Sequence, residues 1–327
     1  MSAVDSASTM GRGEARGRAK GVARDLVELS KPGITRLVVI TSAVGFGVAY
    51  AATEPASRPA GLDLARLLLA CVVGTALCSS GANALNMWME RRRDALMRRT
   101  AARPIPSGRM SHGRALLVGV LLGAAGAVVL AVFANPVSAV VAVSTILTYL
   151  LWYTPLKPLS SLSTLVGTIP GALPPLIGWT AASPAGPDRL HALLDPGGWS
   201  IVALMVVWQV PHFLALAWMY REDYARGGHR VLPVLDGGGP TTVRATLLWT
   251  LALLPVSLAP LFAMPHVVGL LYAAAAVVLW GLFLRPAVRL AREATEPNAR
   301  KVFIASVIYL PLVLGALALN AALSVLA

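Results

Sequence analysis

Charge is scarce in this sequence. Asp, Glu, Lys and Arg together make up 13% of the 327 residues, about half of their usual share in soluble domains. Such a chain cannot cover a large folded surface with groups that water solvates, which excludes an ordinary soluble globular protein. Apolar residues fill 56% of the positions, and the mean hydropathy is +0.68. These values indicate a protein whose solvent is the lipid bilayer.

Cysteine and acidic residues are also few. The two cysteines, Cys71 and Cys78, lie seven positions apart in one apolar stretch, which excludes a disulfide framework and favours a packing role. Fifteen acidic residues stand against 28 basic ones, so the formal net charge is +13. In a soluble protein this excess would suggest nucleic-acid binding. Its distribution between apolar stretches indicates membrane topology instead, and we expect no nucleic-acid partner.

Long apolar runs, by contrast, are abundant. A helix needs about 20 mostly apolar residues to cross the hydrocarbon core. We predict an all-α integral membrane protein with nine transmembrane helices, at residues 34–53, 66–89, 115–134, 137–154, 162–181, 199–219, 243–263, 267–284 and 303–325. Pro170, Pro174 and Pro175 interrupt the fifth stretch. Because neighbouring helices or water must satisfy the freed carbonyls, the prolines predict a broken helix that lines a cavity.

The basic residues define an orientation. If the N-terminus is cytoplasmic, the inner segments hold 25 of the 28 Lys and Arg residues, and only Arg58, Arg66 and Arg189 lie outside. The positive-inside rule therefore predicts nine spans with a cytoplasmic N-terminus and the C-terminus outside. Residues 1–30 are polar and Arg-rich and lack the apolar core of a secretory signal. We predict a flexible basic cytoplasmic tail over 1–30 and one membrane domain over 31–327.

Polar residues recur at helical spacing where the second apolar stretch ends. Asn86, Glu90 and Asp94 follow one another every four positions, and Asn83 lies one turn earlier, so a continued helix places their oxygens along one side. Four arginines come soon afterwards: Arg98, Arg99, Arg103 and Arg109. Mg²⁺ typically joins one or two carboxylates to substrate phosphates, and guanidinium groups match phosphate oxygens. The pattern predicts a magnesium diphosphate site; a solvated helix end with Glu–Arg pairs is the alternative.

A second polar group ends the sixth apolar stretch. Gln209 and His212 lie in its last turns, and Asp223 and Tyr224 follow in the next inner loop. Polar side chains within a span usually face the bundle interior. A buried histidine can be a hydrogen-bonded core group or a functional group, and the sequence leaves both readings of His212 open.

The inner loop after the fourth stretch adds Tyr153 and Lys157. Lys157 either places a positive charge on a diphosphate or only anchors the topology. Carboxylates beside arginines occur in two inner loops and have no counterpart in the outer loops. We therefore expect an active site that opens toward the cytoplasm.

These segments resemble the UbiA superfamily of prenyltransferases, in which two aspartate-rich loops bind an isoprenyl diphosphate through Mg²⁺ within a nine-helix bundle. Asn86, Glu90 and Asp94 match the first motif, Asn-x-x-x-Asp-x-x-x-Asp. Within the superfamily the chain looks like the haem O synthases, through blocks at Lys31–Arg36, Met97–Pro104, Tyr153–Lys157, Gly171–Trp179, Trp208–Phe213 and Asp223–Tyr224. It departs from them at Pro158, Ser163 and Arg92, where the pattern has Arg, Asn and often Asp.

The resemblance implies that farnesyl diphosphate and protohaem IX (haem B) are the substrates. A farnesyl group joins a haem vinyl group, water adds, and diphosphate leaves, which yields haem O. It further implies that Asn86, Glu90, Asp94 and Asp223 hold Mg²⁺ and the diphosphate. The other implied binding residues are Asn83, Arg98, Arg99, Arg103, Tyr153, Lys157, Gln209 and Tyr224. His212 would contact the porphyrin as an iron ligand or a proton-handling group, with a structural role as the third reading.

The implied location is the bacterial inner membrane, crossed many times, with haem A synthase or terminal oxidase assembly as candidate protein partners. Two other functions fit the same residues. The metal motif would equally serve prenyl transfer to a quinone precursor or a chlorophyll-type acceptor. The charges could also form the gate of a polytopic transporter for an anionic substrate, although transporters usually bind near the midplane.

Overall fold

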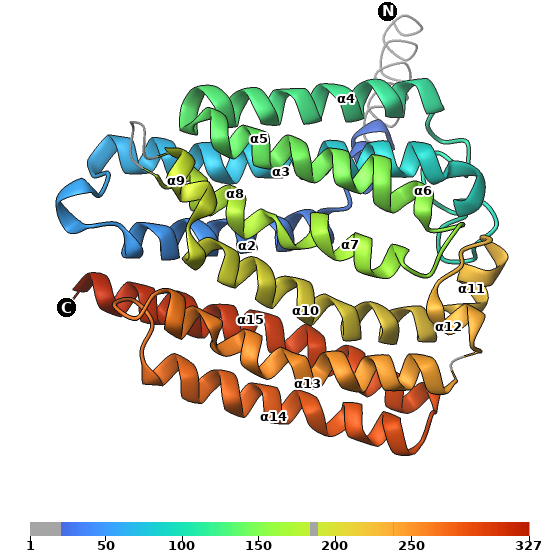
Figure 1. Cartoon of the computed structure of the whole chain (residues 1–327). Helices are drawn as coiled ribbons and strands as arrows, with labels where there is room; N and C mark the ends of the chain where they lie inside the picture. The colour runs from blue at the N-terminus through green and yellow to red at the C-terminus, as the bar shows by residue number, and fades with distance from the viewer. Residues whose placement is uncertain (1–20, 184–188, 238, 327) are drawn as a thin grey trace, which may run out of the picture.

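The computed structural model describes residues 21–183, 189–237 and 239–326, and within these residues it contains helices and no strand (Figure 1). Eight helical segments in this part of the chain are long and apolar enough to cross a membrane. They comprise α2 (Pro32–Ala52), α3 (Gly61–Asp94), α4 with η2 (His112–Val129, Leu130–Ala134), α5 with η3 and α6 (Pro136–Leu147, Thr148–Tyr153, Thr154–Leu156), α9 with α10 (Arg189–Leu194, Pro196–Met219), α13 (Pro240–Ala263), α14 (Leu270–Arg292) and α15 (Glu296–Leu326).

The fifth predicted span forms two short helices. α7 (Ser163–Ala172) and α8 (Pro174–Ala181) are separated at Leu173, with Pro174 at the first position of α8, where a missing N–H has no cost. Pro170, Gly171 and Pro174 line the central cavity. The prediction of a proline-broken helix against a cavity is therefore confirmed. The remaining short elements are η1 (Pro55–Ser57), α11 (Arg221–Arg226) and α12 (Leu232–Leu235).

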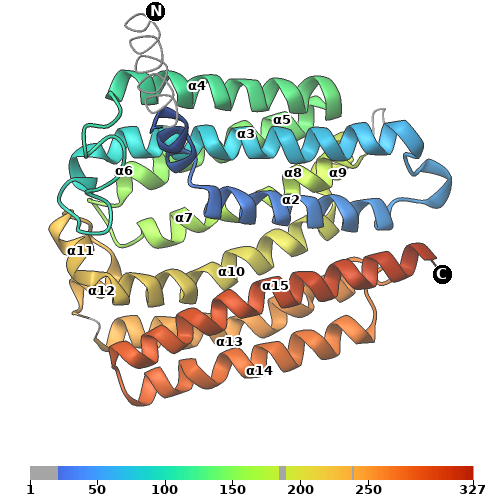
Figure 2. The same ribbon diagram turned by 180° about the vertical axis from the view of Figure 1, so that it is seen from behind.

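The helices form one bundle whose first and last members meet. α2 packs against α3 and α8 on one side and against α15 on another, while α10 contacts α7, α13 and α15. Both views place α6, α11, α12 and the α3–α4 connection at one end of the bundle. The α2–α3 connection and the C-terminal end of α15 lie at the opposite end (Figures 1 and 2). The polar segments that the sequence assigned to the inner side thus gather at a single end.

Residues 21–29, assigned to the tail by sequence, are helical. Leu29 is fully buried, and Asp25 and Glu28 both bind the guanidinium of Arg109, the latter at 2.8 Å. The structure therefore differs from a flexible tail over this segment. Residues 1–20 of the predicted tail lie outside the described residues.

Glycines bring α2 and α8 into backbone contact. A Cβ atom on Gly178 would lie 1.8 Å from the Ser42 carbonyl oxygen, and one on Gly45 would lie 2.0 Å from the Pro175 carbonyl oxygen. Close approach at small residues is the usual way in which membrane helices associate, since lipid provides no hydrophobic force between them. This contact fixes α8, and with it the broken span, against the first helix.

We expect Gly45→Ala to lower the thermal unfolding temperature of the purified protein in detergent. The added methyl group collides with backbone that cannot move away, and overpacking of this kind costs about 1–3 kcal/mol. A Cβ atom on Gly47, two residues along the same helix, would have no neighbouring atom within 4 Å. Gly47→Ala is therefore the matched control and should leave the temperature unchanged or raise it. Equal behaviour of the two variants would contradict the α2–α8 contact.

Candidate active site

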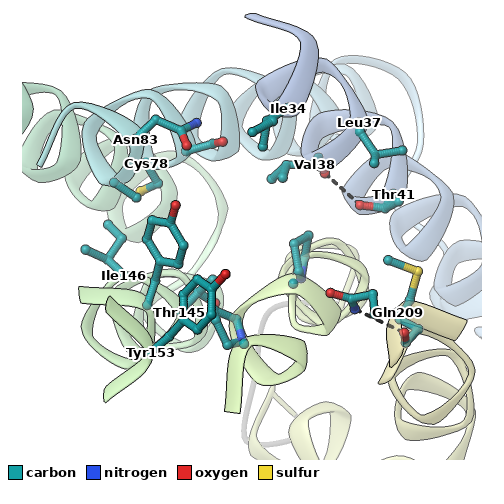
Figure 3. Close-up of a pocket in the computed structure, with 18 of the residues that line it drawn as sticks. Ile34, Leu37, Val38, Thr41, Cys78, Asn83, Thr145, Ile146, Tyr153 and Gln209 are labelled. Carbon is teal, nitrogen blue, oxygen red and sulfur yellow. Dashed lines mark hydrogen bonds between the residues drawn. The ribbon is translucent and has the colours of Figure 1, made fainter. Parts of the chain in front are cut away.

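A cavity of about 380 Å³ lies between α2, α3, α5, η3, α7, α8 and α10. Figure 3 shows Asn83 and Cys78 of α3 across the space from Gln209 of α10, with Tyr153 between them on a third wall. Most of the lining is apolar, and no Asp, Glu, Lys or Arg among the described residues contributes to it. The space suits a hydrocarbon or an aromatic molecule.

A ladder of three polar residues on α3, Asn86, Glu90 and Asp94, lies directly beyond this cavity. The helix continues without a break to Asp94, and Asn86, Glu90 and Asp94 are 1%, 7% and 1% exposed. Their common burial confirms that the four-residue spacing places them on one side of the helix. It also contradicts the alternative of a solvated helix end, because a solvated end would leave these side chains in water.

Hydrogen bonds join this ladder to α6 and to Lys157, which follows it. Lys157 Nζ donates to both oxygens of Glu90, at 2.8 and 3.1 Å. Asn86 Nδ2 donates to Glu90 Oε2 and to Thr154 Oγ1, both at 3.0 Å. Lys31 Nζ completes the cluster by donating to Asn86 Oδ1 at 2.9 Å. Two lysine amino groups therefore face one carboxylate and one amide next to the cavity.

The two lysines differ in their electrostatics. Burial lowers the pKa of Lys157, but the Glu90 carboxylate together with Tyr153 and Tyr149 raises it by more, so the net shift is upward and Lys157 is charged at neutral pH. Burial and the nearby Arg103 lower the pKa of Lys31 to about 7. Lys31 also has φ 47° and is the one non-glycine residue with positive φ in the described ranges, at a cost of about 1–2 kcal/mol. Backbone strain of this kind is typical of functional sites.

Asp94 lies one turn beyond Glu90 and pairs with a different cation. Arg103 Nη1 donates to Asp94 Oδ2 at 2.7 Å, and the side chain of Asp94 is 1% exposed. Arg109, which the sequence also placed near the phosphates, is held by Asp25 and Glu28 instead. Arg103 is thus the arginine that the fold brings to the ladder.

The segment after α10, which contains α11, contacts the segment after α3 through Asp223. Its Oδ1 accepts a hydrogen bond from the backbone N–H of Arg98 at 3.1 Å and a further bond from Arg226. These bonds, opposed by burial, hold the pKa of Asp223 below its usual range. The guanidinium of Arg99 lies 5.0 and 4.6 Å from the ring centres of Tyr220 and Tyr224. Asp223 and Tyr224 therefore contact the loop that carries Arg98 and Arg99 rather than Glu90.

The donor set fits a magnesium ion that is shared with a diphosphate. Among the described residues, no three His, Cys, Asp or Glu side chains converge as a complete metal cage. Glu90 and Asp94 are buried carboxylates whose partners are Lys157 and Arg103. Mg²⁺ typically takes only one or two carboxylates and completes its shell with water and phosphate oxygens. Glu90, Asp94 and the Asn86 amide could hold such an ion.

His212 and Gln209 lie deeper, where α10 borders the cavity. Gln209 Nε2 donates to the Met205 carbonyl at 3.0 Å. His212 Nδ1 lies 2.8 Å from Ser306 Oγ, and the His212 ring stacks with the rings of Trp208 and Phe303, with both centroid distances 5.0 Å. The structure thus separates a charged cluster, at the end of the bundle that carries α6, α11 and α12, from an apolar chamber to which the described residues contribute one imidazole.

Comparison with known proteins places this arrangement in a family. Residues 38–323 match the model of the UbiA prenyltransferase family. The chain belongs to this family. It is 44% identical over 299 residues to the protoheme IX farnesyltransferase of Solibacter usitatus, with 91% of this chain and 98% of the relative covered. It is 42% identical to that of an Anaeromyxobacter strain, with 96% and 99% covered.

Solved structures of the UbiA type share the fold. A structure described as digeranylgeranylglyceryl phosphate synthase superimposes with a TM-score of 0.71 at 17% identity, with 91% of this chain and 98% of that chain covered. A UbiA homolog from Archaeoglobus fulgidus bound to GPP and Mg²⁺ gives 0.54 at 12% identity, with 90% and 99% covered. The bundle is therefore the family fold, built on a very different sequence.

The UbiA motif identified the ladder, but it did not identify three other residues of the site. Lys31 and Thr154 lie in blocks that carry the resemblance without an assigned role, and His229 lies outside those blocks. Lys31 and Thr154 bond to Asn86. His229 is 3% exposed, its Nδ1 has no hydrogen-bond partner in the described structure, and burial lowers its pKa to about 4. Although Pro158 departs from the family pattern, the neighbouring Lys157 still forms an ion pair with Glu90, with Nζ 2.8 Å from Oε1.

Proposed function

We propose that this chain is a protohaem IX farnesyltransferase, which converts haem B into haem O. The observation that carries the proposal is the identity of 44% with a relative of that name, over nearly the full length of both chains. The position of the site supports it, because a charged cluster suited to a diphosphate adjoins an apolar chamber large enough for a prenyl chain. Both substrates are amphiphiles that lie in or at the bilayer.

The reaction breaks the bond between the allylic carbon and the diphosphate oxygen. The farnesyl carbon then bonds to the outer carbon of a vinyl group, water adds to the inner carbon, and one proton is released. We assign Asn86, Glu90 and Asp94 to Mg²⁺ and the diphosphate. Bound Mg²⁺ supplies positive charge against the diphosphate as it leaves. Lys157 and Arg103 add fixed positive charge at the same place, and Lys31 adds a further charge when it is protonated.

The other predicted residues have supporting roles in this proposal. Asp223 and Tyr224 hold the loop that presents Arg98 and Arg99 to the diphosphate, and Asp223 remains a candidate metal ligand. Asn83, Tyr153 and Gln209 line the chamber. The apolar wall excludes water from the carbocation, and the face of the Tyr153 ring, 4.4 Å from Lys157 Nζ, can stabilise positive charge.

We propose nine crossings, with α7 and α8 together forming the fifth. The N-terminus then lies in the cytoplasm and the C-terminus outside, in a bacterial inner membrane. The charge distribution supports this orientation, since the ladder, α11 and α12 lie at the Arg-rich end of the bundle. The diphosphate site would open toward the cytoplasm. Haem O would pass to haem A synthase or to a terminal oxidase in assembly.

Release of diphosphate tests the proposal. Purified protein in detergent, given farnesyl diphosphate and Mg²⁺, should release diphosphate rapidly only when protohaem is present, and a chelator should stop the release. A quinone precursor or a chlorophyll-type alcohol in place of protohaem should give background rates. Rapid release with either of those acceptors and none with protohaem would overturn the proposal, and no release with any acceptor would favour transport.

A further inference from the structure

One ring nitrogen of His212 has a hydrogen-bond partner, and the other has none in the described part of the chain. Nδ1 lies 2.8 Å from Ser306 Oγ of α15. Nε2 has no hydrogen-bond partner in the described part of the chain, and it is not among the fully buried polar atoms that lack one. A histidine with a purely structural role usually satisfies both nitrogens when it is buried. The open nitrogen therefore needs an explanation.

The hydrogen bonds of Ser306 determine which ring nitrogen of His212 carries the hydrogen. Its hydroxyl has one hydrogen, and Oγ donates it to the Phe303 carbonyl at 2.6 Å. Oγ can then only accept at the second contact, so His212 Nδ1 must be the N–H donor. Nε2 is left without a hydrogen in the neutral ring and has its electron pair available.

The ring orientation is fixed as firmly as the tautomer. The rings of Trp208 and Phe303 both stack with the imidazole, and the indole N–H of Trp208 donates to the Ser306 backbone carbonyl at 2.8 Å. α10 and α15 are thus tied together at the histidine. His212 lines the cavity while no described residue of α15 does, so the edge opposite Ser306, which bears Nε2, faces the chamber.

We infer that Ser306 is a positioning residue that directs His212 Nε2 into the cavity as an axial ligand for the iron of the substrate porphyrin. This inference rests on the proposed function. Histidine ligands of metals typically donate their other N–H to a fixed acceptor, which sets the tautomer and the ring plane. The relay from His212 through Ser306 to the Phe303 carbonyl has this form.

The surroundings favour a ligand over a proton acceptor. A base would become an imidazolium cation, and the described cavity lining contains no Asp or Glu to balance it. A ligand stays neutral and gains a bond to the iron, and the cavity lining next to His212 is mostly apolar, like the faces of the macrocycle. Ligation would also fix the distance between the porphyrin and the diphosphate cluster.

Absorption spectra of the ferric and ferrous protohaem complexes test the inference, because the bands depend on the axial ligand. The full chain in detergent should give the spectrum of a histidine-ligated haem. His212→Ala should lose that spectrum, and added imidazole should restore it. Ser306→Ala should weaken protohaem binding by about 10- to 100-fold, and Ser306→Thr, which keeps a hydroxyl, should retain most of the affinity.

Ser257→Ala is the matched control. Ser257 is also fully buried, and its hydroxyl bonds a ring side chain of α15, Tyr309, at 2.6 Å, so any general effect of loosening helix packing should appear there too. An unchanged spectrum and affinity in His212→Ala would overturn the inference. If turnover were lost in that variant while the spectrum stayed normal, His212 would handle protons and the proposed function would stand. If the unaltered protein released no diphosphate with protohaem, the proposed function itself would fail.

Discussion

Asp94→Asn is expected to lower the rate of prenyl transfer by about 10²- to 10³-fold, the usual cost of losing one group that stabilises transition-state charge. Asp94 is buried and bonds Arg103 at 2.7 Å. Asparagine keeps the shape of the side chain but loses the negative charge. The metal would then lose a ligand and Arg103 its partner. Initial rates of diphosphate release, measured across Mg²⁺ concentrations, give the comparison.

The control for this variant lies on the same helix. Asp63 is near the start of α3, its side chain is 74% exposed, and it pairs with Arg66 at 3.4 Å. Since exposed pairs of this kind contribute little, Asp63→Asn should change the rate less than about twofold. A near-normal rate in Asp94→Asn, with the protein folded, would remove the ladder from the mechanism.

Lys157→Met should reduce both turnover and stability. The ammonium of Lys157 binds both oxygens of Glu90, with side-chain exposures of 14% and 9%. Removing one partner of a buried ion pair leaves an uncompensated charge and costs about 3–5 kcal/mol. Removal of the same positive charge from the leaving diphosphate should lower turnover by about 10²-fold. Thermal unfolding and initial rates are measured on the same preparation.

A double variant separates the two effects. In Glu90→Gln with Lys157→Met the unpaired carboxylate is gone, so the unfolding temperature should recover part of the loss while the rate should not. Lys301→Met, at an exposed lysine near the start of α15, should change neither quantity. Recovery of turnover in the double variant would mean that Lys157 serves only to neutralise Glu90.

Hydropathy predicted the helices because lipid selects them by composition, but it did not predict their ends. The second stretch was predicted at 66–89, whereas α3 spans Gly61–Asp94; likewise α15 begins at Glu296 instead of 303. In both cases the helix continues into polar residues, which a hydrophobicity criterion excludes by design. In α3 this extension carries Glu90 and Asp94, whose helical position was predicted from the four-residue spacing instead.

The contacts between distant segments could not be predicted in this way. Glu90 and Lys157 are 67 positions apart, and His212 and Ser306 are 94 apart. Which side chains meet depends on the rotation of each helix about its axis, which is set by packing such as the Gly45–Pro175 contact. The left-handed backbone of Lys31 is likewise a property of the assembled site. Arg109 shows the opposite case. Its position in the sequence predicted a contact with the phosphates, whereas in the structure it pairs with Asp25 and Glu28.

The mass of the porphyrin recovered after turnover tests the central claim most directly. Purified protein in detergent is incubated with protohaem, farnesyl diphosphate and Mg²⁺, and the porphyrin is then extracted and its mass measured by mass spectrometry. The proposed function predicts a haem that is heavier by one farnesyl group and one hydroxyl group, formed by the unaltered protein and formed far more slowly by Asp94→Asn. Recovery of unmodified haem alone, from a folded sample supplied with Mg²⁺, would contradict it.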